Sequence, residues 1–194
     1  MPKLGMEPIR KDALVKATIT EIGRVGSLDV TVSQIARRAG MSPALAHHYF
    51  GSKEEMFLAA MRHILSLYGA EVRGALAVTT GPQARLEAVL RASFSPGNFR
   101  REAVGAWLNF WVMAQTVPQA RRLLAIYQRR LRSNLLACLR PLAGAKASAL
   151  ADGLGALIDG LYLREVLKSG PPDGAAAVAT ALNYLNSQLT GDDA

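Results

Sequence analysis

The chain has 194 residues, of which 50% are hydrophobic and 20% are charged, a balance typical of a folded globular protein and not of a disordered one. Its single cysteine, Cys138, excludes an intrachain disulfide and a zinc site built from cysteines. Two long uncharged segments, 103–120 and 174–191, are interrupted by amide side chains and are too polar for a bilayer span, which needs about 20 mostly apolar residues. We therefore expect a cytoplasmic protein that makes no contact with a membrane.

The formal net charge of +8 favours a polyanionic partner without identifying it. This charge is unevenly distributed. Residues 1–50 contain seven Lys and Arg against four Asp and Glu, and residues 101–150 contain eight against one. Residues 151–194 contain two against six, so the basic character lies in the first and middle parts of the chain.

Helix signals follow one another closely in the first part of the chain. Apolar residues with helical spacing, from Ile9 to Val25, predict a helix over residues 8–25. Thr31 and Gln34 form a capping-box pattern that opens a short helix ending at Gly40. Ser42-Pro43 starts a second short helix that stops near Gly51, and Ser52-Lys53-Glu54-Glu55 starts a long helix reaching about Leu76.

Helical periodicity also dominates the rest of the chain, and no stretch alternates long enough to predict a strand. Glycine and proline clusters divide it. The pattern predicts helices over residues 83–93, 100–116, 118–140, 146–168 and 173–189. The predicted fold class is all-α, with about nine helices.

The segment from Thr31 to Phe50 combines two short helices across a Gly40-Met41-Ser42 turn, which is the pattern of a helix-turn-helix. Its apolar residues can pack together while the polar side chains stay outside, as a DNA recognition helix requires; those expected outside are Ser42, His47, His48 and Tyr49. An ordinary helical hairpin is the alternative interpretation of the same spacing.

Residues 31–42 (TVSQIARRAGMS) and 48–55 (HYFGSKEE) resemble the signature of TetR-type transcriptional repressors. The resemblance implies a DNA-binding domain over residues 1–52 and a ligand-sensing, dimerising domain over 53–194. It also implies a palindromic double-stranded operator as partner. His47 departs from the tyrosine that the family often has there, so the operator sequence does not carry over. The residues expected to contact DNA are Thr31, Gln34, Ser42, Pro43, Ala44, His47, His48, Tyr49 and Lys53.

Three further blocks are similar to the choline-responsive repressors of glycine-betaine synthesis genes within this family: residues 1–6 (MPKLGM), 106–111 (AWLNFW) and 156–161 (ALIDGL). This resemblance implies choline as the effector and control of choline uptake and glycine-betaine synthesis. A repressor that senses another cationic or hydrophobic molecule, such as a drug or a toxic amine, is the alternative.

Aromatic residues and one carboxylate define the candidate effector site. Trp107 and Trp111 are one helical turn apart. Asp159 lies in an otherwise apolar run and needs a partner if it is buried. Arg164 could supply that partner, and the aromatic residues could be core packing. The alternative is a quaternary ammonium ion held between aromatic faces and a carboxylate. The residues expected to bind it are Trp107, Phe110, Trp111, Asp159 and Tyr162.

The last two helices carry more apolar surface than one helix can hide on one side. Either they are buried all round or one face meets a second subunit, and the family resemblance implies a homodimer. Ala181 is a position where an added charge would weaken the dimer if its face meets the partner.

Two other classes of function remain possible on the sequence. One is a small helical enzyme that uses Asp159 and a histidine, although all three histidines lie within residues 47–63. The other is a DNA-binding protein that senses nothing. We expect no catalytic residues, no cofactor and no metal site, because no nucleophile triad, metal-ligand spacing or phosphate-binding glycine loop is present.

Overall fold

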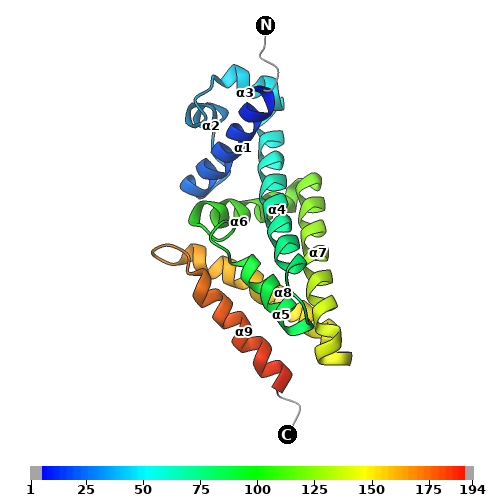
Figure 1. Cartoon of the computed structure of the whole chain (residues 1–194). Helices are drawn as coiled ribbons and strands as arrows, with labels where there is room; N and C mark the ends of the chain where they lie inside the picture. Colours follow the sequence, from blue (N-terminus) through cyan, green and yellow to red (C-terminus); the bar gives the residue numbers. More distant parts are fainter. Residues whose placement is uncertain (1–5, 191–194) are drawn as a thin grey trace. The chain divides into compact units, whose positions relative to one another are not determined.

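The computed structural model describes residues 6–190, and those residues form α-helices and a single 3₁₀ turn without strands (Figure 1). The expected all-α class is confirmed, and the described part contains nine α-helices. The first block of the choline-repressor resemblance, residues 1–6, lies almost entirely outside the described residues. The elements are α1 (Met6–Val25), α2 (Val32–Arg38), α3 (Pro43–Phe50), α4 (Lys53–Ala77), α5 (Pro82–Ser93), α6 (Arg101–Thr116), α7 (Pro118–Ala143), the 3₁₀ turn η1 (Gly144–Lys146), α8 (Ala147–Leu167) and α9 (Gly174–Thr190).

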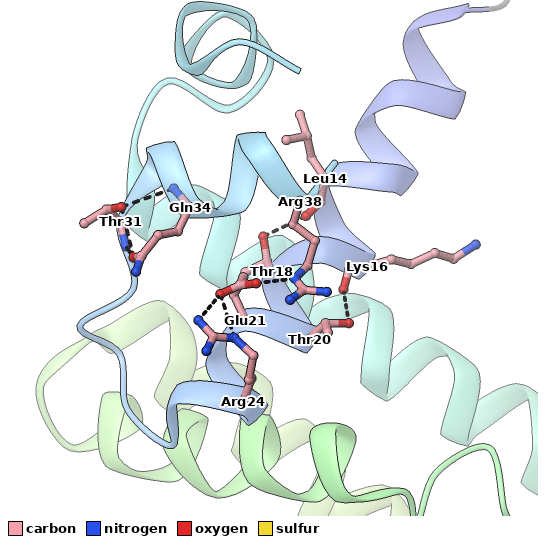
Figure 2. Close-up of polar contacts among 9 residues, drawn as sticks. All are labelled: Leu14, Lys16, Thr18, Thr20, Glu21, Arg24, Thr31, Gln34 and Arg38. Atoms are coloured by element: carbon pink, nitrogen blue, oxygen red, sulfur yellow. Dashed lines mark hydrogen bonds and ion pairs between the residues drawn. The ribbon is translucent and has the colours of Figure 1, made fainter. Parts of the chain in front are cut away.

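The predicted start signals are formed as hydrogen bonds. The backbone N–H of Gln34 donates to Thr31 Oγ1 at 3.2 Å, and the backbone N–H of Thr31 donates to the side-chain Oε1 of Gln34 at 2.7 Å. The two bonds complete the capping box of α2 (Figure 2). Ser42 Oγ accepts from the Leu45 amide at 3.2 Å and caps α3. These bonds satisfy helix N–H groups that have no partner within the helix.

Two local expectations are wrong. Pro141 does not end its helix, because α7 continues to Ala143. Proline removes the bond to the carbonyl four residues earlier, and here that residue, Ala137, is exposed, so water can solvate its carbonyl. Ile9 and Val25 are 63% and 41% exposed, so the buried face of α1 is shorter than the apolar pattern suggests.

The helices group into two compact units, and the first contains, of the described part, residues 6–64 together with 101–123. Within it, α1 packs against α2 and α6. A Cβ on Gly23 would lie 2.3 Å from the Glu102 carbonyl oxygen, and one on Gly105 would lie 3.3 Å from Gly23 Cα. Helices α1 and α6 therefore meet backbone to backbone, which only glycine permits at Gly23.

A buried carboxylate ties α2 to α1 within the same unit. Glu21 on α1 accepts from Arg24 Nη2 at 2.9 Å and also pairs with Arg38 of α2 (Figure 2). The two guanidinium groups hold the pKa of Glu21 below its usual value, although burial alone would raise it. Glu21 thus fixes the first short helix of the helix-turn-helix on α1.

The second unit contains residues 65–100 and, of the described part, 124–190. Helix α9 packs against α5 and α8, and a Cβ on Gly174 would lie 2.3 Å from the Phe94 carbonyl oxygen. Ala181 is fully buried in this unit. It therefore belongs to the interior of its own chain, and the expectation that a charge there would probe a subunit interface is wrong.

The two units do not coincide with the functional division between residues 1–52 and 53–194, because α6 packs on α1. That division concerns which residues read DNA and stays a prediction. Across residues 6–190, none of the helices is both long and apolar enough to span a bilayer.

Candidate DNA-reading surface and effector site

The second helix of the helix-turn-helix, α3, presents most of the residues expected to contact DNA on its outer side. Ser42, Pro43, Ala44, His47 and His48 are exposed. Ala46 is fully buried and marks the inner side of the helix. Tyr49, on the same helix, is half-buried; of the expected DNA contacts elsewhere, Thr31 is exposed and Gln34 is half-buried. An apolar inner side with a polar outer side is the arrangement that a recognition helix needs.

His47 is held by the end of its own helix. Its Nδ1 lies 3.2 Å from the Gly51 carbonyl oxygen, and because a carbonyl can only accept, Nδ1 carries the hydrogen. Gly51 ends α3 with a φ of +74°, a conformation that favours glycine. A neutral His47 therefore presents Nε2 as a hydrogen-bond acceptor.

Lys53, at the start of α4, donates from Nζ to the Leu28 carbonyl oxygen at 3.1 Å. The same ammonium lies 5.4 Å from the centroid of the Phe57 ring. Lys53 is exposed, and an ammonium has three donors, so donors remain for a phosphate while one holds the loop before α2.

The aromatic residues of α6 lie close together in the first unit. The Trp107 and Trp111 rings meet edge to face with 6.4 Å between centroids, and Phe110 is fully buried. Trp111 Nε1 is buried, and among residues 6–190 no acceptor bonds it. A buried indole N–H normally has a partner, so Trp111 brings an unsatisfied donor to this aromatic pair.

Asp159, in the second unit, is the candidate counter-ion. Its Oδ1 accepts from the Tyr127 hydroxyl at 3.5 Å, and no cation pairs with it in the described part of the chain. Arg164 is exposed and is not among the groups that shift the pKa of Asp159, so the alternative in which Arg164 neutralises Asp159 is wrong. Five residues on one helix place the two side chains on different faces. Burial raises the pKa of Asp159 to about 6, and the Tyr127 bond lowers it in part.

Two tyrosines that were not predicted from the sequence belong to this site: Tyr127 bonds to the carboxylate, and Tyr68 contacts Tyr127. Tyr127 on α7 is buried and lies edge-on to Tyr68 of α4, with 5.5 Å between ring centroids. Burial raises the pKa of Tyr68 to about 12 and that of Tyr127 far above its usual value, and the Asp159 charge adds to both shifts. The burial of Tyr127 could have been predicted from the sequence, because helical spacing places it on the same face of α7 as Leu131, Leu135 and Cys138, which are also buried.

Ser93, at the end of α5, anchors two of the phenols. Its hydroxyl donates to the Val89 carbonyl at 2.9 Å, so the Tyr68 hydroxyl, 3.4 Å away, donates to it. The Tyr162 hydroxyl donates to the Ser93 carbonyl. The Tyr162 ring also packs against Phe94 and Phe99, at 5.7 and 4.8 Å between centroids. Because the hydroxyl already donates to Ser93, Tyr162 could contact a ligand only through its ring.

The five predicted effector residues are thus divided between the units. Trp107, Phe110 and Trp111 form one cluster in the first unit, and Asp159 lies in the second with Tyr162. Within the second unit, Asp159 bonds directly to Tyr127 alone, and its charge also helps to raise the pKa values of Tyr68 and Tyr162. We call Asp159 and these three tyrosines the tyrosine–aspartate cluster.

Comparisons with known proteins identify the class. A family model described as bacterial regulatory proteins of the tetR family matches residues 14–60, and one for the C-terminal part of BetI-type transcriptional repressors matches residues 82–190. The HTH-type transcriptional regulator BetI of Brucella anthropi is 49% identical over 99% of this chain and 100% of its own length. BetI of Rhizobium meliloti is 50% identical, over 97% of this chain and 94% of its own.

Solved structures share the fold. A transcriptional regulator from Pseudomonas aeruginosa PAO1 has a TM-score of 0.80 and 26% identity, covering 97% of this chain and 94% of its own. A regulator from Saccharomonospora viridis, solved in complex with choline, has a TM-score of 0.81 and 22% identity, covering 91% and 95%.

A helix-turn-helix with an exposed recognition helix, joined to a helical body, defines a DNA-binding transcriptional regulator and not an enzyme. The hypothesis of a helical enzyme is therefore wrong. The chain belongs to the TetR family, among the BetI-type repressors.

Proposed function

We propose that the protein is a homodimeric repressor that controls genes for choline uptake and for glycine-betaine synthesis, and that choline modulates its binding to a palindromic operator. The observation that carries the proposal is the Asp159 carboxylate, which is held among phenols without a cation of the described chain. A buried carboxylate without a counter-charge is costly, and a cationic effector would neutralise it.

The chemistry around Asp159 suits a quaternary ammonium ion. Such an ion has no N–H, so the carboxylate can act on it only by charge, while aromatic faces attract its methyl groups. Each well-placed ring contributes roughly 0.5–2 kcal/mol, and micromolar affinity corresponds to about 8 kcal/mol. The rings of Tyr68, Tyr127 and Tyr162 together with the carboxylate are therefore of the right order. For Trp107, Phe110 and Trp111, a role in binding the effector stays a prediction.

The comparisons support the choice of choline. The relatives of about half identical sequence are BetI regulators, and the regulator from Saccharomonospora viridis with the same fold was solved with choline. The second candidate is a repressor that senses another cationic or hydrophobic molecule. A primary amine of similar size should bind more weakly than choline, since its strongly hydrated N–H groups would lose water.

Calorimetry with choline on the full chain tests the effector. The wild type should bind, Asp159→Asn should lose most of the affinity, and Trp107→Ala tests the tryptophan cluster. Asp152→Asn is the matched control, because Asp152 is an exposed carboxylate on the same helix that pairs with Arg132 at 2.7 Å. Absence of heat in the wild type, with operator affinity indifferent to millimolar choline, would refute choline as the effector.

Coupling to DNA requires that choline prefer one conformation of the chain. A coupling free energy of about 1–3 kcal/mol changes operator affinity about 5- to 150-fold. We propose α4 as the element that transmits it, because α4 begins at Lys53 beside the recognition helix and continues past residue 65 to Tyr68. Operator titrations with and without choline measure the coupling directly. A regulator that senses nothing would show none.

Dimerisation is proposed through α8 and α9. Ala156 is exposed on α8, and Leu163 and Leu167 are 48% and 76% exposed on the same helix. Paired recognition helices about one DNA turn apart require such a twofold contact. Ala156→Arg should shift the protein toward monomers in sedimentation and weaken operator binding. Ala137→Arg, an exposed alanine on α7, is the matched control, and a wild type that is monomeric while binding its operator tightly would refute the dimer.

A further inference from the structure

Tyr49, near the end of the recognition helix, receives contacts from α1 as well as from its own helix. Arg10 Nη1 donates to the Tyr49 hydroxyl oxygen at 3.4 Å, and Lys11 Nζ lies 5.9 Å from the Tyr49 ring centroid. The His48 ring is 5.4 Å from that of Tyr49. Basic and aromatic side chains from α1 and α3 are therefore gathered around one phenol.

The direction of the Arg10 bond determines what the phenol can still do. A guanidinium only donates, so the Tyr49 oxygen is the acceptor in this bond. The hydroxyl hydrogen is left without an acceptor among residues 6–190 and can donate outward. Arg10 has five N–H donors and uses one of them here, so both side chains retain donors at the surface.

Charge distinguishes Arg10 from the other cations of α1. Lys11 pairs with Glu7 at 2.7 Å, Lys16 pairs with Asp12 at 2.7 Å, and Arg24 pairs with Glu21. Arg10 bonds to a neutral phenol, and no carboxylate of the described chain pairs with it. An unneutralised guanidinium beside a free hydroxyl donor, both half-buried, matches the acceptors of a phosphate group.

We propose that Arg10 and Tyr49 together bind one backbone phosphate of the operator, with Arg10 supplying the charge and Tyr49 a hydroxyl donor. The inference rests on the DNA-binding function and extends the DNA contacts to α1, outside the helix-turn-helix. Phosphate contacts of this kind set the position of a recognition helix on the duplex and carry no sequence information. A purely structural role, in which the pair only fastens α1 to α3, is the competing explanation.

The salt dependence of binding separates these roles. Removal of one charged phosphate contact lowers the slope of log K against log salt by about 0.9. Arg10→Gln, which removes the charge and keeps a polar side chain, should lower the slope by about that amount per protomer, on the DNA upstream of its own gene and on a random duplex alike. Arg10→Lys should keep the slope. Lys16→Gln, a paired lysine of the same helix, should leave it unchanged.

Tyr49→Phe completes the test, because it removes the hydroxyl and keeps the ring. It should weaken binding on both duplexes without changing the salt slope, and the double variant with Arg10→Gln should lose less than the product of the two single losses. An unchanged slope for Arg10→Gln, or variants that lower only the melting temperature, would overturn the proposal. A wild type that binds neither duplex would instead overturn the proposed repressor function.

Discussion

Asp159→Asn should stabilise the protein without ligand at neutral pH while abolishing its response to choline. The pKa of Asp159 is raised from 3.8 to about 6, chiefly by burial. Between those values the folded state holds a proton that the unfolded state has lost, so stability falls as the pH rises through this window. Well above pH 6 the carboxyl is fully ionised, and the loss of folding stability caused by its burial has reached its full value. The difference of about 2.2 units corresponds to about 3 kcal/mol, an upper value for what the substitution can recover.

Thermal unfolding at about pH 7.5 and about pH 5, without choline, measures this cost. A change of 1 kcal/mol shifts the melting temperature by about 2–4 °C in a chain of this size. The amide introduced by Asp159→Asn would still need hydrogen bonds, so the gain at pH 7.5 should be only part of the upper value. One pH unit below the folded pKa, wild-type Asp159 should recover about 1.4 kcal/mol relative to the variant. The exposed Asp152→Asn control should show no such gain.

Choline should raise the melting temperature of the wild type above that of Asp159→Asn. A ligand at about 100 times its dissociation constant stabilises by about 2.7 kcal/mol, and this increment should appear in the wild type and be absent from Asp159→Asn. A variant that melts below the wild type at pH 7.5 without choline would refute the reasoning. It would show that the ionised carboxylate stabilises the fold through a partner of its own.

Further substitutions test the DNA-reading part and its support. Lys53→Ala should weaken binding equally on operator and random DNA and lower the salt slope by about one per protomer; an unchanged slope would contradict a phosphate contact. Gly23→Ala should lower stability by about 1–3 kcal/mol or more, since its Cβ would meet the Glu102 backbone, whereas Gly74→Ala, in open space on α4, should raise it by up to about 1 kcal/mol. Arg38→Ala should lower the melting temperature at neutral pH, because Glu21 loses one of its two cations; this loss should diminish as the pH falls below 4.5, the usual pKa of that carboxyl.

The helix-turn-helix was predictable because local chemistry specifies it. Thr31 and Gln34 exchange hydrogen bonds three residues apart, and Ser42 caps the next helix beside Pro43. Such bonds depend only on neighbouring residues, so the sequence pattern and the structure agree there. Pro141 shows the limit of the same approach, since α7 continues past it to Ala143 although proline usually interrupts a helix.

The surroundings of Asp159 were only partly predictable. The run of apolar neighbours indicated burial, but Tyr127 is 32 residues away in sequence and reaches the carboxylate only through helix packing. Arg164 was the plausible partner by proximity, yet its place on α8 directs it to solvent. The prediction that Ala181 lies at a subunit interface was wrong for a related reason. An apolar helix face alone does not show whether it packs against its own chain or against another.

The glycine contact between α1 and α6 brings the helix that carries the predicted tryptophan cluster into backbone contact with a helix of the DNA-binding region. Trp107 lies two residues after Gly105, which contacts Gly23 with no side chain between the two backbones. Closely packed surfaces transmit displacement because they cannot compress. Arg38 and Glu21 then bind α2 to the same α1 helix. At this point α6 therefore contacts α1 without an intervening layer of side chains, so the packing of α6 bears directly on the helix that holds α2.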